Sequence, residues 1–297
     1  MSRTNGRRPR REDRPIDGLL LVDKPAGITS HDVVDAARRA LRTRRIGHAG
    51  TLDPFATGLL VLLVGHATRL LPHLNGEPKV YQATIVFGSE TDTDDVTGVV
   101  TRTAATPDTS RVREAIAALT GPIDQVPPAY SAKQVEGRRA YAAARKGQML
   151  TLTPVRVVVH EWQIGELSSE RLASVITCGG GTYIRALARD LGRLSDSAAH
   201  LSSLRRTRSG SFDIANAISA DALRDGAVVP QPPRMAVSHL PAVALSADEV
   251  HHVRQGRPVP AVGRDRKAAL VDSSGALVAI AEGVGESWQP RVVLPDA

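Results

Sequence analysis

The chain has 297 residues, of which 42% are hydrophobic, so it can bury a substantial core in two domains, or in one large domain, without disulfides. Its single cysteine, Cys178, excludes an internal disulfide and a cysteine-rich zinc site. No apolar run approaches the roughly 20 residues of a membrane span, and the first residues lack the apolar core of a signal peptide. We therefore expect a cytoplasmic protein that does not enter membranes.

The charge balance favours a polyanionic partner only weakly. The net charge is +7, but 33 arginines against 5 lysines also fit a GC-rich genome. Six arginines fall in residues 1–14, whereas residues 235–297 hold six basic and seven acidic residues, a net charge of −1. Aromatic residues make up 3% of the chain, which is too few for an extended surface that stacks single-stranded bases.

The first part of the chain alternates apolar segments with polar ones. Residues 1–15 are arginine-rich and contain two prolines, which is typical of a disordered tail. The apolar run 59–64 fits a buried strand or a buried helix, and its pattern does not decide between them. The other predicted elements here are a strand at 18–25, a helix capped by Ser30 and ending at Arg42, a glycine-rich loop at 44–58 and a strand at 80–87.

The second part combines long strands with helices. We expect the strands 155–164 and 172–178 to pair, and the glycines at 179–181 to lead into a helix that ends at Leu194. The remaining predicted elements are an acidic loop at 88–98, a helix capped by Ser110 and ending at Leu119, a short helix around 139–146, a proline-rich linker at 228–234, a helix at 246–255 and a hairpin of 268–271 with 277–281. Because helices and strands do not alternate regularly, we expect an α+β fold, with one domain at 16–234 and a small β-rich domain at 235–297.

The segment 47–58, GHAGTLDPFATG, is the most informative one. It presents a single carboxylate, Asp53, with His48 five residues before it and Pro54 directly after it. Asp-Pro is also a common turn initiator, so a plain connection between two elements is the competing interpretation. The loop by itself leaves both interpretations open.

A series of motifs, taken together, resembles the TruB family of tRNA pseudouridine synthases. KPAGITSHDVV at 24–34 precedes GHAGTLDPFATGLL at 47–60, and four further motifs follow in the family's order. These are KVYQATIVFGSETDTDD at 79–95, PPAYSAKQVEGRRAYAAAR at 127–145, GTYIRALARDLG at 181–192 and LSSLRRTRSGSF at 201–212. The resemblance spans residues 18 to 212 and implies the pseudouridine synthase fold, a mixed and largely antiparallel central sheet with flanking helices.

The resemblance implies that uridine 55 in the T-loop of tRNA is isomerised to pseudouridine. The target base is first flipped out of its stack; then the glycosidic C–N bond breaks, the base rotates and a C–C bond forms, without a cofactor or a metal. The family's catalytic aspartate corresponds to Asp53. A carboxylate can attack the sugar C1′ or the base C6, or deprotonate the sugar, and the sequence leaves these three routes open.

The family also implies roles for five residues around the flipped base. His48 corresponds to the histidine that fills the vacated space, Tyr81 to the tyrosine that stacks on the base, and Arg185 to the arginine that pairs with the catalytic carboxylate. Leu204 corresponds to the apolar residue that packs near the base. Tyr183 lies two residues before Arg185, so both side chains point to one side if this stretch is extended. An ordinary core histidine and an ordinary strand tyrosine are the competing interpretations of His48 and Tyr81.

Basic residues in and near these motifs are expected to hold RNA phosphates, which supplies affinity rather than specificity. We expect the acidic loop 90–95 to organise nearby arginines, with Asp92 near the site. The C-terminal domain takes the position of the family's PUA-type RNA-binding domain, although its net charge is −1. The expected phosphate contacts are Lys24, Arg44, Arg45, Arg138, Arg139, Lys146, Arg205, Arg206 and Arg208.

The expected partner is tRNA, bound through its T-arm by a monomer that needs no other protein. Two alternatives remain. One is an RNA-binding module that helps tRNA to fold without any chemistry, and the other is a synthase that modifies another RNA. Asp53 together with Tyr81 and Arg185 favours catalysis, because a pure binding module has no use for the carboxylate.

Overall fold

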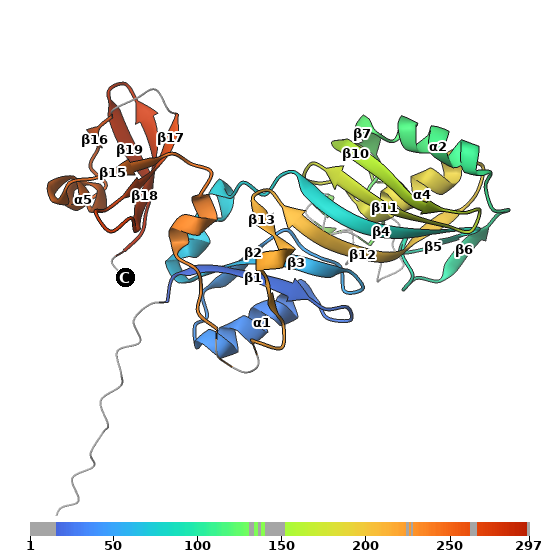
Figure 1. The fold of residues 1–297 in the computed structure, drawn as a ribbon, viewed down its shortest axis with the longest axis horizontal. Coiled ribbons are helices and arrows are strands. Elements are labelled where there is room, and N and C mark those ends of the chain that lie inside the picture. The colour runs from blue at the N-terminus through green and yellow to red at the C-terminus, as the bar shows by residue number, and fades with distance from the viewer. Residues whose placement is uncertain are drawn as a thin grey trace, which may run out of the picture.

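The computed structural model of the chain describes residues 16–130, 134–135, 138–139, 152–223, 226, 228–261 and 266–295, with only the backbone described at 134–135 and 138–139. Figure 1 shows one large sheet and a separate small sheet at the C-terminal end. The large sheet has the spatial order β14 (Ile218–Ser219), β1 (Gly18–Lys24), β3 (Thr57–Val64), β12 (Ala199–Ser209), β4 (Lys79–Phe87), β11 (Arg171–Cys178), β10 (Val155–Leu167) and β7 (Gly121–Gln125), with β2 (Ile46–Ala49) paired to β3 and β13 (Phe212–Asp213) paired to β12.

The small sheet and the helices complete the fold. The small sheet has the order β15 (Ala242–Ala244), β17 (Lys267–Val271), β18 (Leu277–Val284), β19 (Ser287–Val293) and β16 (Val259–Pro260). Two further antiparallel pairs are β5 (Ser89–Thr91) with β6 (Val100–Thr103), and β8 (Gln134–Val135) with β9 (Arg138–Arg139). The helices are α1 (Ser30–Leu41), α2 (Thr109–Ala118), α4 (Ile184–Leu194) and α5 (Ala247–Arg254), with 3-10 helices η1 (Gly65–His73), η2 (Ile214–Asn216) and η3 (Pro233–Val237).

The strand β3 is buried on both faces. Its residues alternate between two hydrophobic clusters: Leu59 and Leu63 pack in one, and Leu60 and Leu62 in the other. A strand covered on both sides reads as a continuous apolar run, so the pattern at 59–64 could not separate strand from helix. Gly58 lets β3 approach β12: its φ is +101°, and a Cβ there would lie 2.3 Å from a main-chain oxygen of β12.

The helices α2 and α4 cover one face of the half-sheet formed by β12, β4, β11 and β10, and the main core lies between them (Figure 1). The helix α1 packs against β1 and β3 instead. It begins with a capping box in which Thr29 and Asp32 satisfy each other's backbone N–H groups. The capping residues are Thr29 and Asp108, rather than the predicted Ser30 and Ser110, because these side chains accept the first free N–H groups of α1 and α2.

The small sheet and the large sheet both contribute residues to one hydrophobic cluster, which also contains residues of η1 and η3. This cluster contains Leu19 and Leu59 from the large sheet and Ile280 and Val292 from the small one. The predicted domain boundary between 234 and 235 falls inside η3, two of whose residues are buried in the same cluster. The division into 16–234 and 235–297 therefore stays a prediction.

The α+β fold class is confirmed, as is the antiparallel pairing of the strands predicted at 155–164 and 172–178 and of the C-terminal hairpin. The segment predicted as a loop at 44–58 contains the strand β2, which pairs with β3. Arg139, where a short helix was expected, lies in β9, and 140–146 and the tail 1–15 are outside the described residues. Within the described part of the chain, the helices are all too short or too polar to cross a membrane.

Candidate active site

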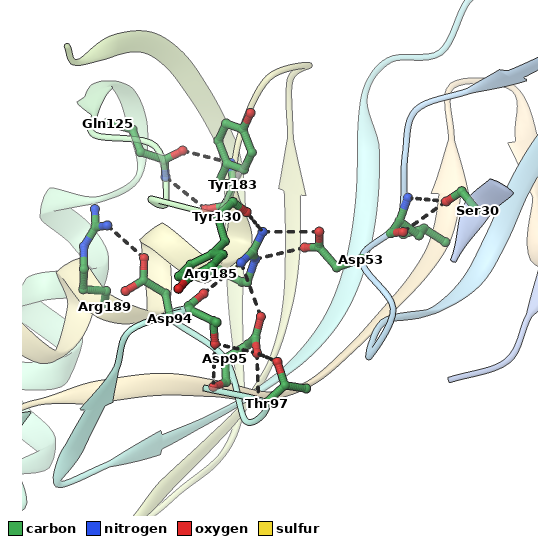
Figure 2. Close-up of polar contacts among 12 residues, drawn as sticks. Ser30, Asp53, Asp94, Asp95, Thr97, Gln125, Tyr130, Tyr183, Arg185 and Arg189 are labelled. Atoms are coloured by element: carbon green, nitrogen blue, oxygen red, sulfur yellow. Dashed lines mark hydrogen bonds and ion pairs between the residues drawn. The ribbon is translucent and has the colours of Figure 1, made fainter. Parts of the chain in front are cut away.

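The loop that carries Asp53 is fixed on both sides of this residue. On one side, the hydroxyl of Ser30 donates to the carbonyl of Leu52 (3.0 Å) and accepts from its N–H (2.9 Å), as Figure 2 shows. On the other side, the carbonyl of Pro54 accepts from the N–H of Gly27 (2.8 Å). One anchor, Gly27, lies between β1 and α1, and the other, Ser30, is the first residue of α1, so this stretch determines where the carboxylate stands.

Lys24 is a third anchor of the same loop. Its ammonium donates to the carbonyls of Pro25 (2.9 Å), Ile28 (2.7 Å) and Pro54 (3.2 Å), and the residue is 0% exposed. Burial lowers the pKa of Lys24 to about 8, against the opposing charge of nearby Asp53. The predicted phosphate contact of Lys24 is therefore wrong: three donors meet three carbonyls, and RNA cannot reach the group.

A single guanidinium connects two carboxylates at this site (Figure 2). Arg185, in the first turn of α4, lies with Nε 2.9 Å and Nη2 3.2 Å from the two carboxylate oxygens of Asp53, and with Nη1 3.3 Å from Asp95. It also donates to the carbonyls of Thr93 (2.8 Å) and Tyr130 (2.8 Å). Five contacts around one planar group leave it little freedom to turn, so the orientation of Asp53 is set as well.

Asp95 is itself held firmly. One of its oxygens accepts from the hydroxyl of Thr93 (2.9 Å), the N–H of Thr97 (2.9 Å) and the hydroxyl of Thr97 (2.5 Å). The other oxygen faces Arg185, and the residue is 3% exposed. Asp95 thus holds the side of the guanidinium that points away from Asp53.

The electrostatics of Asp53 are set by opposing effects. Burial raises the pKa of Asp53, Arg185 lowers it, and the charge of Asp95 raises it again. The side chain of Asp53 is 36% exposed, against 5% for Arg185 and 4% for Asp95. Asp53 is therefore the member of the trio that a substrate can reach, and Arg185 is what favours its ionised form.

Asp53 opens into a cavity of about 280 Å³ that unites most of the predicted site residues. Tyr81, Tyr183, Arg185 and Leu204 line it together with Asp53. These residues come from four separate segments of the chain, so the motifs spread over 150 residues of sequence converge on one small space. Within the described residues, no group of three or more His, Cys, Asp or Glu side chains is placed to hold a metal ion.

His48 is not among the residues that line this cavity. It lies in β2, and its Nδ1 is buried without a hydrogen-bond partner in the described residues. Burial lowers the pKa of His48, and the charge of Arg206 acts in the same direction, so the ring is neutral at pH 7.

The N-terminus of α4 is placed by a side chain from β7. Gln125 accepts from the N–H of Tyr183 (2.8 Å) and donates to its carbonyl (3.1 Å). The helix begins at Ile184, so Arg185 is helical whereas Tyr183, the N-cap residue, is not. The stretch from Tyr183 to Arg185 is therefore not extended throughout, yet both side chains line the cavity.

Three of the expected phosphate contacts, Arg205, Arg206 and Arg208, lie in β12, and the neighbours Arg205 and Arg206 point to opposite faces of the sheet. Arg206 is 1% exposed and donates to two backbone carbonyls, one of them that of Gly50 (2.9 Å) in the Asp53 loop. Its predicted phosphate contact is wrong because the side chain is buried. Arg205 points away from Arg206 and pairs with Asp23 at 2.6 and 3.0 Å, while Arg208 is exposed.

The remaining predicted phosphate contacts lie elsewhere. Arg44 and Arg45 are exposed in the turn between α1 and β2. Arg138 and Arg139 form β9, but their side chains lie outside the described residues, as does Lys146. These five contacts stay predictions.

The acidic loop organises arginines, as predicted. Glu90 pairs with Arg102 (2.7 Å) and Arg193 (2.7 Å), and Asp94 pairs with Arg189 (2.9 Å). Asp92, which we expected near the site, does not line the cavity; its carboxylate accepts from the N–H of Val99 (2.8 Å) and closes a turn. The neighbour that reaches the site is Asp95, which the sequence did not single out, since the seven acidic or hydroxyl residues in a row at 89–95 offer no pattern for choosing one of them.

A larger groove, of about 1010 Å³, lies on the other side of the sheet, where Gln82 and Gln163 point. Pro54 lines it, but neither Asp53 nor Arg185 does. Its one charged lining residue among those described, Arg205, is already paired with Asp23. The reactive groups therefore belong to the smaller cavity.

Comparison with known proteins places most of the chain in one family. Residues 38–184 match the TruB family pseudouridylate synthase N-terminal domain, and residues 185–237 match the tRNA pseudouridylate synthase B C-terminal domain. The chain is 44% identical to tRNA pseudouridine synthase B of Thermobifida fusca (strain YX) over 93% of this chain and 98% of that protein. It is 43% identical to the protein of the same name from Mycobacteroides abscessus, over 94% and 97%.

Solved structures agree on the fold. A Cbf5–Nop10–Gar1 complex contains a chain that superposes with a TM-score of 0.68 at 25% identity, covering 93% of this chain and 84% of that one. An H/ACA RNP bound to a substrate RNA containing 2′-deoxyuridine gives a TM-score of 0.69 at 24% identity, covering 94% and 85%. With nearly full-length relatives at more than 40% identity and the same α+β fold, this chain belongs to the TruB family of pseudouridine synthases.

Proposed function

We propose that this protein isomerises uridine 55 in the T-loop of tRNA to pseudouridine, with Asp53 as the catalytic carboxylate. The observation that carries the proposal is the ion pair of Asp53 with Arg185 at the wall of a cavity that Tyr81 and Leu204 also line. The nearly full-length relatives named tRNA pseudouridine synthase B support the choice of RNA.

The reaction is an isomerisation, so it needs no oxidant, reductant or second substrate. The bond from the sugar C1′ to N1 of uracil breaks and a bond from C1′ to C5 forms; C5 gives up its proton and N1 gains one. Asp53 can attack C1′, attack C6 or deprotonate the sugar, and each of these routes begins from the carboxylate rather than the acid. Arg185 therefore serves all three, because it favours the ionised form of Asp53 and fixes the direction of its oxygens.

The size of the cavity fits a single flipped nucleotide. At about 280 Å³ it has no room for a stacked helix, so the target uridine has to leave the T-loop before it meets Asp53. In our proposal the ring of Tyr81 stacks on the base, Leu204 packs beside it and Tyr183 closes the opposite wall. His48, which is neutral and lies outside the cavity, fills the space in the RNA that the base leaves.

The rest of the RNA is held by charge and by the small domain. In our proposal Arg44, Arg45 and Arg208, which are exposed, contact phosphates, and the C-terminal domain at 235–297 acts as a PUA-like RNA-binding domain. The enzyme works in the cytoplasm as a monomer without an obligate protein partner. Affinity for tRNA should then fall steeply as salt is raised, because each neutralised phosphate releases counterions. A flat salt dependence would count against these contacts.

The substrate assignment is tested by incubating the full-length protein alone with unmodified tRNA transcript and mapping pseudouridine by position. We expect modification at the T-loop uridine and at no other uridine. Modification confined to another position, or to another RNA offered in the same mixture, would refute the assignment. A requirement for an added protein would refute the stand-alone role.

A further inference from the structure

Lys79 is a charged residue of the Asp53 cavity to which neither the motifs nor the reaction gives a role. It is the first residue of β4 and lines the cavity together with Asp53 and Tyr81. Lys79 and Tyr81 are two residues apart in this strand, so their side chains leave the same face, separated by roughly 6.6–6.8 Å along the strand. Lys79 and Tyr81 are therefore neighbouring side chains on the cavity wall that β4 forms.

The side chain of Lys79 extends between two backbone segments of the site. A methyl group added at Gly50, in the Asp53 loop, would lie 3.6 Å from Cε of Lys79, and one added at Gly180 would lie 3.7 Å from its Nζ. Both positions are glycines, and other charged groups share the space beside the lysine: the carboxylate of Glu77 at Gly180 and the guanidinium of Arg206 at Gly50. The ammonium thus stands between the loop that carries the carboxylate and the glycine turn that precedes α4.

The ammonium of Lys79 has no hydrogen bond or ion pair within 4.0 Å in the described part of the chain. It is nevertheless partly buried, and this burial lowers the pKa of Lys79, against the opposing charge of Glu77. A half-buried ammonium that keeps its three donors free is unfavourable in the empty site. An anionic ligand in the cavity would remove that cost.

The other charged groups of the cavity are already engaged. Among the described residues, three cations, Lys79, Arg185 and Arg206, and one carboxylate, Asp53, line it, so these residues contribute a net charge of +2. Arg185 is paired with two carboxylates, and Arg206 donates to backbone carbonyls. Lys79 is therefore the lining cation whose donors are available to a ligand, and a compact ammonium suits a phosphate oxygen.

We propose that Lys79 binds one of the two backbone phosphates that flank the uridine in the cavity. This inference rests on the proposed function, because it places the base against Tyr81 and its nucleotide along β4. The two side chains leave the strand roughly 6.6–6.8 Å apart, a spacing comparable to that between the base of a nucleotide and its phosphate. The contact fixes the nucleotide along the cavity and so sets which sugar atom meets Asp53.

The experiment is a double-mutant cycle that combines a changed RNA phosphate with a changed Lys79 side chain. It uses the full-length protein and a T-arm hairpin RNA. In two modified hairpins, the phosphate on one side or the other of the target uridine is replaced by an uncharged methylphosphonate. Affinity is measured for the unchanged protein, for Lys79→Met and for Lys79→Arg. Arg171→Met is the matched control, because Arg171 is exposed at the opposite end of β11 from the residue that pairs with Lys79.

We expect one of the two methylphosphonates to weaken binding to the unchanged protein roughly tenfold. Lys79→Met should bind the ordinary hairpin about tenfold more weakly than the unchanged protein does. Its affinity for the hairpin with that methylphosphonate should equal its affinity for the ordinary hairpin. Lys79→Arg, which keeps the charge, should remain sensitive to it, and Arg171→Met should behave like the unchanged protein.

The proposal is overturned if neither methylphosphonate weakens binding to the unchanged protein, a result that needs no variant to fold. It is also overturned if Lys79→Met, shown by thermal melting to be folded, loses as much on each methylphosphonate as the unchanged protein does. Mapping of pseudouridine in the ordinary hairpin by the unchanged protein is read separately. If no pseudouridine forms but the affinities follow the expected pattern, the proposed function is overturned and the phosphate contact stands.

Discussion

Arg185 contacts both carboxylate oxygens of Asp53, at 2.9 and 3.2 Å, and its remaining nitrogen lies 3.3 Å from Asp95. The cation thus serves two anions that differ in exposure, one open to a substrate and one closed in by threonines. Such an arrangement fixes the reactive carboxylate through its buried partner and leaves its exposed side open to a substrate. The first two predictions test this arrangement.

The rate of the reaction should fall on the acid side as Asp53 takes up its proton. Burial raises the pKa of Asp53 above the usual 3.8, and Arg185 opposes the rise. Arg185→Lys replaces a two-point contact by a single point charge, so the pKa of Asp53 should rise further and the acid limb should move to higher pH. Single-turnover pseudouridine formation measured from about pH 4 to pH 8 checks this. An acid limb that stays in place, or moves to lower pH, would contradict it.

Asp95→Asn should slow the chemical step and leave RNA binding nearly unchanged. The substitution removes the charge that holds the far side of Arg185, and the loss of a charge-assisted contact predicts a rate about 10- to 100-fold lower. Asp92→Asn is the matched control, because Asp92 is exposed in the same loop and Asn keeps the oxygen that accepts from Val99. Equal rates for the two variants under single-turnover conditions would show that Asp95 has no part in orienting the site.

Lys24→Met should destabilise the fold. It leaves three carbonyls, among them that of Pro54, without their donor in a place that water does not reach, which costs on the order of 3 kcal/mol. Lys267→Met is the control: Lys267 is 46% exposed, and its ion pair with Glu282 at 3.8 Å is worth little. Urea denaturation of both variants gives the comparison. A Lys24→Met protein as stable as Lys267→Met would refute the anchoring role.

Asp94 should make stability depend on pH in the acid range. Burial raises its pKa from 3.8 to about 6, with Arg189 opposing, so the folded state binds this proton more tightly than the unfolded state. The contribution of Asp94 to stability is therefore greatest below pH 3.8, declines as the pH rises to about 6 and is constant above that. The free energy of unfolding, measured against pH for the unchanged protein and for Asp94→Asn, should differ in slope in this window. Parallel curves would disprove the assignment.

The motifs predicted which residues would converge in the fold, because they tie residue types to positions. Asp53, Tyr81, Tyr183, Arg185 and Leu204 do line one cavity. The sequence could not choose between the aspartates of the acidic loop. That choice depends on a turn in which Asp94 has a φ of +59° and on hydrogen bonds of the loop to Leu201, about a hundred residues away.

Charge was harder to place than chemistry. Lys24, Arg206, Arg44 and Arg45 are all basic residues in or near the motifs, and the sequence does not distinguish them. In the structure Lys24 and Arg206 are buried, whereas Arg44 and Arg45 are exposed. Each of the two buried cations donates to a carbonyl of a distant segment, Lys24 to that of Pro54 and Arg206 to that of Gly50, and those segments meet only in the folded chain. Lys79 could have been noticed from its place two residues before Tyr81, since strand alternation puts both on one face.

The most direct test of the account is pseudouridine mapping with the Asp53→Asn protein on unmodified tRNA transcript, together with its affinity for that tRNA. Asn has nearly the shape of Asp and keeps one oxygen for Arg185, but it cannot act as the carboxylate. We predict that the unchanged protein forms pseudouridine at the T-loop uridine, and that Asp53→Asn binds tRNA with similar affinity and forms none. Pseudouridine formation by the Asp53→Asn protein at a rate close to that of the unchanged protein would contradict the central claim.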